Sequence, residues 1–278
     1  QVHGLKSVKY RNIFVEMFVR TWSIVYVLHF SLHFSGGLRV PTSKHPLLFL
    51  FTSSASKRQC DALCKWGKLM SKPGVPAIFR NAHVRVNAND GSAEQLEDLQ
   101  NCLDLEFPNI VKHVDKNPFN AGRTMGAVQA LDYEMKQGHL EEYDWVVHLH
   151  PDKFIINGGH LADALQNHTA SVIASFFACP EMIGKPFEAH MWDSLSFDLF
   201  AFRPNSVHRE IFSKWETYAD IPERYLFEVA FKASLSDGRV MLVPGQGRFP
   251  PCPMGGEPDA FGMMHEHNLA NVDSFINQ

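Results

Sequence analysis

The segment Tyr143-Asp144-Trp145-Val146-Val147-His148-Leu149-His150-Pro151-Asp152 contains a nearly continuous apolar run that ends just before a proline. A short apolar run bounded by turn residues is typical of a strand covered on both faces. Pro151 cannot donate a hydrogen bond to a neighbouring strand, so the strand must end there. Asp152 is therefore expected at the carboxyl end of a buried strand, where open α/β sheets bind their ligands.

Apolar runs and helical patterns alternate on both sides of this strand. Further strands are expected over residues 46–51, 77–86, 109–114, 171–177 and 195–203. Helices are expected over residues 56–70, 92–103, 120–136, 159–166, 206–218 and 222–236, and a loop rich in Gly and Pro over residues 244–258. The turn Asn89-Asp90-Gly91-Ser92 is expected to supply the N-cap of the second of these helices. This alternation predicts an α/β fold whose mainly parallel sheet carries helices on both faces.

Composition and charge are those of a globular protein. The 278 residues are 45% hydrophobic and 20% charged, which is ordinary for a chain with a sizeable core. The net charge of -4 lacks the basic excess of a nucleic-acid binder, so we expect no nucleic acid as partner. An N-terminal segment over residues 1–40 is expected to precede one domain over residues 41–278.

The chain has five cysteines, none of them in a Cys-x-x-Cys pair, so a zinc ribbon is not expected. Cys60 and Cys64 lie one turn apart on an expected helix, where packing is the favoured role. A disulfide from either of them to Cys102 remains open. The redox compartment is therefore open as well.

Asp152 and the histidine two residues before it could bind a metal ion. A carboxylate at a strand end suits a hard divalent cation such as Mn²⁺ or Mg²⁺, which bridges phosphate oxygens. His150 is expected on the same face as His148, where its imidazole could ligate a metal or contact a phosphate. The alternative is a plain turn, because Asp often bonds its own backbone there.

Two further segments flank the strand in a particular order. Asn117-Pro118-Phe119-Asn120-Ala121-Gly122-Arg123-Thr124-Met125-Gly126-Ala127 leads into an expected helix, and Glu141-Glu142-Tyr143-Asp144-Trp145-Val146 enters the strand. This order resembles the GT-A nucleotide-sugar glycosyltransferases, a Rossmann-like superfamily in which an acidic Asp-x-Asp-type motif follows the strand. His150-Pro151-Asp152 stands in the place of that motif, and His150 replaces its first acid. The final acid, here Asp152, is usually the direct metal ligand in the family.

Later segments extend the resemblance to about residues 46–268. Residues 194–204 resemble the family's strand on the acceptor side, and residues 222–228 resemble the acidic helix of its catalytic region. Residues 264–268 look like the late histidine motif that completes the metal shell in many members. The resemblance thus implies a metal site made of Asp152, His150, His267 and His265.

The remaining site residues are expected at strand ends, in the Asn/Gly/Arg turn and on the later segments. The expected donor contacts are Thr52, Ser53, Asn87, Asn120, Gly122, Arg123 and His150. An inverting enzyme also needs a base for the acceptor hydroxyl, and Glu228, Asp198 and Asp193 compete for that role. The sequence leaves open whether configuration is retained or inverted.

The resemblance implies a glycosyltransferase that moves a hexosyl or pentosyl group from a nucleotide-diphosphate sugar to a hydroxyl of a glycan or glycoconjugate. Mn²⁺ or Mg²⁺ is the implied cofactor. Two alternatives remain: a catalytically inactive GT-A-like protein that binds a glycan or a partner, and a sugar nucleotidyltransferase. The missing first acid favours the former, whereas the lack of glycine in residues 53–58 weighs against the latter.

An apolar run over residues 21–34 follows basic residues at positions 6, 9, 11 and 20, which is the charge order of a signal-anchor. The run is shorter than the roughly 20 apolar residues of a typical span. Residues 12–36 are therefore expected to be an anchor, an additional helix packed on the domain, or poorly ordered sequence outside it. An anchor predicts a type II membrane protein of the Golgi or another endomembrane, and a helix predicts a cytoplasmic protein. Asn167-His168-Thr169 is an N-glycosylation pattern, which matters only in a lumenal domain.

Overall fold

A seven-stranded sheet organises the part of the chain that this computed structural model describes. The described residues are 45–89, 91–107, 110, 112–117, 123–177, 195–206, 239–245, 263–266 and 268–277. They fall within one compact unit, Lys44–Gln278. The expected anchor at 12–36 and most of the expected helices at 206–218 and 222–236 lie outside them. None of the described helices is both long and apolar enough to span a membrane.

The sheet is mainly parallel, as the sequence predicts. Its order is β3-β2-β1-β4-β7-β6-β8. The strands are β1 (His45–Ser53), β2 (His83–Ala88), β3 (Lys112–Lys116), β4 (Tyr143–Leu149), β6 (Val172–Phe177), β7 (Leu195–Phe202) and β8 (Val240–Gly245). Only β7 is antiparallel to its neighbours, β4 and β6, so the other strands of this sheet all run in one direction. Their carboxyl ends therefore share one edge of the sheet.

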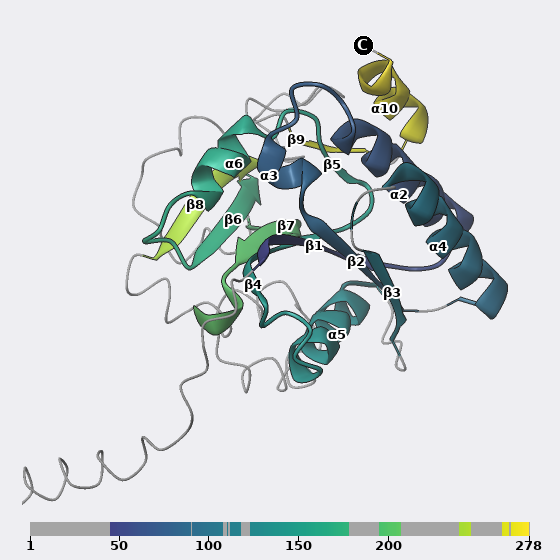
Figure 1. The fold of residues 1–278 in the computed structure, drawn as a ribbon, viewed down its shortest axis with the longest axis horizontal. Coiled ribbons are helices and arrows are strands. Elements are labelled where there is room, and N and C mark those ends of the chain that lie inside the picture. The colour runs from purple at the N-terminus through teal and green to yellow at the C-terminus, as the bar shows by residue number, and fades with distance from the viewer. Residues whose placement is uncertain are drawn as a thin grey trace, which may run out of the picture. The chain divides into compact units, whose positions relative to one another are not determined.

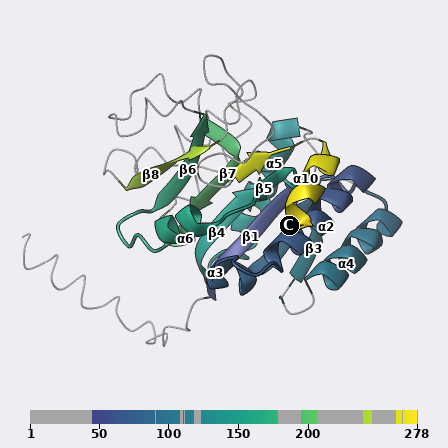
Figure 2. The same cartoon turned by 90° about the horizontal axis from the view of Figure 1, so that it is seen from above.

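Helices cover both faces, which confirms the expected layers. Helices α2 (Lys57–Met70) and α4 (Ala93–Glu106) lie on one face, and α5 (Arg123–Lys136) lies on the other (Figure 1). Two shorter helices, α3 (Ala77–Arg80) and α6 (Gly159–Leu165), complete the described part of the domain together with α10 (Leu269–Ile276). Figure 2 shows α10 beside α2, to which an ion pair between Lys65 and Asp273 joins it.

Strand β1 is buried on both faces because its side chains alternate between the two helical layers. Phe49 and Phe51 point to α2, and their rings lie 4.9 and 5.2 Å from the ring of Trp66. Leu48 and Leu50 point the other way and are also fully buried. Each such side chain contributes about 1.5–3 kcal/mol by leaving water, so this strand is the apolar centre of the fold.

The expected strand at residues 77–86 is wrong in its first half. Residues Ala77–Arg80 form the short helix α3, with Phe79 buried, and β2 begins only at His83. A short apolar run fits a buried helix turn as well as a strand, so periodicity could not separate them. The sequence also missed β5 (Lys153–Ile155) and β9 (Met263–His265), which pair with each other. It missed the edge strand β8 as well, whose last two residues, Pro244 and Gly245, were expected in a loop. Proline is tolerated in such a position because it lies on an edge strand.

The loop after β2 is shaped by two residues. Ser92 caps α4 as expected: its hydroxyl accepts from Gln95 N at 3.2 Å, and Gln95 Oε1 accepts from Ser92 N at 2.8 Å. Gly91 has φ 132°, and a Cβ there would lie 2.5 Å from the Cβ of Ala55. Only glycine permits both this backbone conformation and this approach to the loop after β1.

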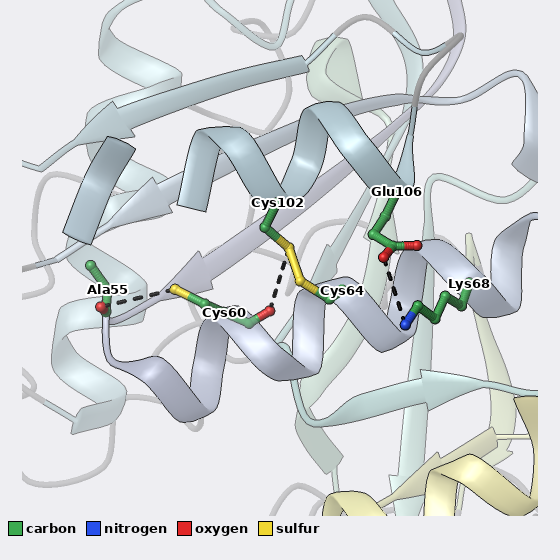
Figure 3. Close-up of a disulfide and its surroundings, with 6 residues drawn as sticks. All are labelled: Ala55, Cys60, Cys64, Lys68, Cys102 and Glu106. Carbon is green, nitrogen blue, oxygen red and sulfur yellow. Dashed lines mark hydrogen bonds and ion pairs between the residues drawn. A yellow bond between two sulfur atoms is a disulfide. The ribbon is translucent and has the colours of Figure 1, made fainter. Parts of the chain in front are cut away.

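A disulfide joins Cys64 of α2 to Cys102 of α4, with Cα atoms 6.1 Å apart (Figure 3). The preference for packing cysteines was therefore wrong for Cys64, and Cys60 is the one that stays a free thiol. The helices approach closely at the next turn, where a Cβ on Gly67 would lie 2.6 Å from the Cβ of Glu106. Burial raises the pKa of the Cys60 thiol, which keeps it protonated and slows its attack on the disulfide.

We expect Cys64→Ser to lower the free energy of unfolding by about 4 kcal/mol, because the disulfide closes a loop with a sequence separation of 38 residues. Urea unfolding followed by tryptophan fluorescence measures this loss. Cys60→Ser is the matched control, since it alters a thiol on the same helix without opening the loop. Equal stability of the two variants would contradict the crosslink.

Candidate active site

The loops at the carboxyl edge are tied to one another by short hydrogen bonds. After β1 and β2, Asn89 N donates to Ser53 O at 2.8 Å, and after β3, Asn117 N donates to Ala88 O at 2.8 Å. The Asn117 amide also donates to Asn89 Oδ1 at 3.3 Å. The ends of three neighbouring strands are thus held in a fixed arrangement at the edge where ligands of such sheets bind.

The turn that carries Asp152 is fixed from three sides. Within the turn, Lys153 N donates to His150 O at 3.0 Å. From the C-terminal segment, Glu266 N donates to Asp152 O at 3.0 Å. From α2, Trp66 Nε1 donates to Lys153 O at 2.9 Å. These bonds fix the backbone of the turn, and with it the point at the sheet edge from which the Asp152 side chain extends.

The carboxylate of Asp152 forms an ion pair with Arg58 near the start of α2. Arg58 Nη2 lies 3.7 Å from Asp152 Oδ2, and the two side chains are 53% and 14% exposed. A pair that is half solvated on one side contributes at most about 1 kcal/mol. The guanidinium is thus a half-exposed cation beside a mostly buried carboxylate.

His150 lies beside His148, on the face of the sheet that was expected. Their ring centroids are 5.6 Å apart. His148 is fully buried, stacks on Phe200 of β7 at 4.7 Å, and contacts Thr52 Oγ1 through Nε2 at 2.9 Å. His148 therefore fixes the end of β4 to β1 and β7. His150 directly follows the last residue of β4, at the sheet edge, and is partly exposed.

The late histidine segment lies next to the Asp152 turn. β9 pairs antiparallel with β5, and the Cα of His265 stands opposite that of Lys153. His267 lies outside the described residues. For His265 the structure describes the backbone but not the side chain. Two distant segments of the chain that the sequence assigns to one metal site are therefore neighbours in the fold.

Three of the expected donor contacts are buried at the carboxyl ends of β1 and β2. Thr52 is 5% and Ser53 4% exposed, and the Ser53 hydroxyl donates to Ser54 O at 2.7 Å. Asn87 is fully buried, and its amide donates to Glu134 Oε1 at 2.7 Å. Within the described part of the chain, Asn87 Oδ1 has no hydrogen-bond partner, so its acceptor is the polar group still available to a donor.

The other expected site residues are placed only in part. Arg123 opens α5 and Asp198 lies within β7, but the structure does not describe the side chain of either. Residues Asn120, Gly122, Asp193 and Glu228 lie outside the described residues. The roles predicted for these six residues stay predictions.

Four residues that support the site were not among the expected ones. They are Arg58, Trp66, Lys153 and Glu266. Lys153 belongs to the Asp152 turn, and the other three contact that turn through the bonds given above. Arg58 follows β1 in a basic pair, Lys57-Arg58, which is the one signal in the sequence that could have suggested a cation there. The bonds from Trp66 and Glu266 depend on tertiary packing and leave no local pattern.

A second cluster of charged residues lies between β2, β3 and α5. Ligand atoms of Asp115, Glu134 and His139 all lie within 4.8 Å of one another, a spacing that could suit a metal ion. Arg85 already bonds this group: its Nη1 donates to Asp115, lies 3.4 Å from Glu134 Oε2 and lies 3.0 Å from His139 Nδ1. The guanidinium thus supplies the positive charge that a metal ion would bring, and the cluster is a partly buried ion-pair network around the fully buried Glu134.

Among solved structures, this chain has distant matches. No family model and no curated protein sequence matches this chain. TarS of S. aureus is similar at TM-score 0.45 and 15% identity, over 73% of this chain and 36% of that one. Galactosyltransferase LgtC in complex with donor and acceptor sugar analogs is similar at TM-score 0.44 and 12% identity, over 70% and 73%.

A third match is the mannosyltransferase PcManGT from Pyrobaculum calidifontis in complex with GDP-Man and Mn²⁺, at TM-score 0.40 and 11% identity, over 65% of this chain and 51% of that one. The chain spans well under half the length of TarS. At these TM-scores and identities the matches do not extend to donor, acceptor or metal.

We expect Glu134→Ala to lower the free energy of unfolding by about 3–5 kcal/mol, because it leaves the buried Arg85 with fewer partners. Lys68→Ala is the matched control. It removes a half-exposed pair with Glu106 at 3.7 Å and should cost less than about 1 kcal/mol. Urea unfolding of both variants measures the difference, and a loss below 1 kcal/mol for Glu134→Ala would argue against a tight network.

Proposed function

We propose that this chain transfers a sugar from a nucleotide-diphosphate sugar to an acceptor hydroxyl at the carboxyl edge of its sheet. The observation that carries the proposal is the position of Asp152. Its backbone is bonded on both sides, its carboxylate faces a cationic group, and the histidine-bearing strand β9 lies next to it. A fixed carboxylate at this edge suits the binding of a charged phosphate ligand through a cation.

The residues at the turn fit a divalent metal ion. Asp152 offers carboxylate oxygen and His150 offers imidazole nitrogen, a donor set that suits Mn²⁺ better than Mg²⁺. The carboxylate already accepts positive charge at this point, because Arg58 lies 3.7 Å from it. His265 and His267 are the further ligands that we propose. A bound cation would offset the charge that develops on the leaving diphosphate.

The chain's own groups would divide the remaining work. The bond between the anomeric carbon and the diphosphate oxygen breaks, a bond to the acceptor oxygen forms, and the acceptor proton passes to a base. Glu228, Asp198 and Asp193 are the candidate bases. Arg58 would turn from Asp152 to the diphosphate when the cation binds, since its side chain is half exposed and its pair with Asp152 contributes at most about 1 kcal/mol.

We also infer that the domain works inside an endomembrane compartment. The disulfide between Cys64 and Cys102 supports this location, because such bonds persist in oxidising compartments and are rare in the cytosol. The signal-anchor proposed for residues 12–36 would deliver the domain there as a type II membrane protein.

We expect Asp152→Asn to abolish metal-dependent binding of nucleoside diphosphates. Titration calorimetry with UDP and GDP, with and without Mn²⁺, measures this effect after a thermal-shift screen of nucleotide-sugars has chosen the nucleotide. The smallest loss that would support the assignment is about tenfold in affinity, or about 1.4 kcal/mol. Removal of a direct metal ligand should exceed this threshold.

Asp163→Asn is the matched control for Asp152→Asn, since it neutralises an exposed carboxylate on α6. Unchanged Mn²⁺-dependent binding in Asp152→Asn would overturn the assignment. Products from a turnover assay then separate the functions: a released nucleoside diphosphate indicates sugar transfer, whereas released pyrophosphate indicates nucleotidyl transfer.

We expect Arg58→Gln to raise the affinity for Mn²⁺ by up to about fivefold while weakening nucleotide-sugar binding in the presence of Mn²⁺. The first effect follows because an exposed ion pair worth up to about 1 kcal/mol no longer competes for Asp152. The second follows because a cationic contact to the diphosphate is lost. Lys57→Gln, a neighbouring change of equal charge, is the control. Parallel loss of both affinities would contradict the proposed exchange.

A further inference from the structure

The tripeptide Asn167-His168-Thr169 is the chain's single Asn-x-Ser/Thr sequence, and the proposed transfer reaction leaves it without a role. It occupies the loop between α6, which ends at Leu165, and β6, which begins at Val172. His168 and Thr169 are exposed, and Asn167 is partly exposed. The pattern is therefore presented in a surface loop, as an acceptor of N-linked glycan must be.

The loop has a defined conformation in which the amide of Asn167 is accessible. Its Oδ1 accepts from Thr169 N at 2.9 Å, from Thr169 Oγ1 at 2.7 Å and from Ala170 N at 3.3 Å. Its Nδ2 makes one long contact, to Met241 Sδ at 3.9 Å. An amide nitrogen has two N–H bonds, so one can face the sulfur while the other carries a sugar.

The position of the loop keeps a glycan away from the candidate active site. Asn167 precedes β6 and so lies at the amino edge of the parallel strands, whereas Asp152 lies at their carboxyl edge. Arg203, just beyond the end of the antiparallel β7, fixes this loop by donating to Ala170 O at 3.0 Å and to Asn167 O at 3.4 Å. A large group on Asn167 is therefore compatible with both folding and donor binding.

The disulfide provides independent support. Such bonds persist in oxidising compartments, and the endoplasmic reticulum lumen is both oxidising and the place where N-linked glycans are added. We propose that Asn167 carries an N-linked glycan. The inference rests on the proposed lumenal location and is independent of the proposed transfer activity.

The modification is a balanced group transfer. The donor is an oligosaccharide on a polyprenyl diphosphate, supplied by the host membrane. A bond forms between Asn167 Nδ2 and the anomeric carbon of that oligosaccharide, and the bond from this carbon to the diphosphate oxygen breaks. The polyprenyl diphosphate leaves, and the amide proton passes to a base of the host transferase.

The test is expression of the full chain in cells with a eukaryotic secretory pathway, followed by digestion with peptide-N-glycosidase. We expect a loss of mass equal to one glycan, and peptide mass spectrometry should locate the resulting conversion of asparagine to aspartate at position 167. A wild-type chain of unmodified mass would overturn the proposal, whether its Cys64–Cys102 disulfide is found oxidised or reduced.

Matched variants at one position separate the pattern from the loop structure. Thr169→Ser keeps the hydroxyl and should keep the glycan, whereas Thr169→Val keeps the shape of the side chain and should lose the glycan. Retention of the glycan in Thr169→Val would overturn the assignment to Asn167. Nucleotide binding by the enzymatically deglycosylated wild type should be unchanged, because the loop lies at the opposite edge of the sheet from Asp152. The glycan is detected by mass and not by activity, so a failed transfer assay would leave the assignment of the glycan to Asn167 intact.

Discussion

The parallel pairing of β1 with both β2 and β4 is the constraint on which the rest of the structure depends. It places the ends Ser53, Ala88 and Leu149 at one edge, and it fixes which side chains face which helical layer. A slip of one residue would turn Phe49 and Phe51 away from Trp66 and leave the α2 layer without its aromatic contacts. Because such a slip exposes or crowds large apolar groups, the register is strongly specified, and the geometry of the sheet edge is specified with it.

Segments distant in sequence converge on the turn after β4. Helix α2 reaches it through Trp66 and Arg58, and the C-terminal segment reaches it through Glu266 and the pairing of β9 with β5. The disulfide and the close approach at Gly67 in turn hold α2 against α4. The position of Asp152 therefore depends on contacts spread over most of the described chain, which explains how a single acid can be presented at a fixed point.

The sequence predicts the features that have a local cause and misses those that arise from packing. The apolar run before Pro151, the cap at Ser92 and the alternation of strands and helices each follow from local patterns, and the structure confirms them. The helix at Ala77–Arg80 was missed because a short apolar run has no decisive period. The choice of Cys64 over Cys60 depends on how α2 is rotated against α4, and the contact of Arg58 with Asp152 depends on how the loop after β1 folds back, so neither could be predicted locally.

The two groups of acids and histidines in this fold differ in what an arginine does to them. Arg85 is 9% exposed and lies among three potential ligands, so in a poorly solvated site it is bound strongly, and its departure would take the guanidinium away from the fully buried carboxylate of Glu134. Arg58 is 53% exposed and contacts one carboxylate oxygen at 3.7 Å, so water can replace that contact at little cost. The number of ligand atoms alone would favour the Asp115, Glu134 and His139 group as a metal site. The exposure of the competing guanidinium reverses that order, and it is the physical reason why we propose the exchangeable cation at Asp152 and not at this group.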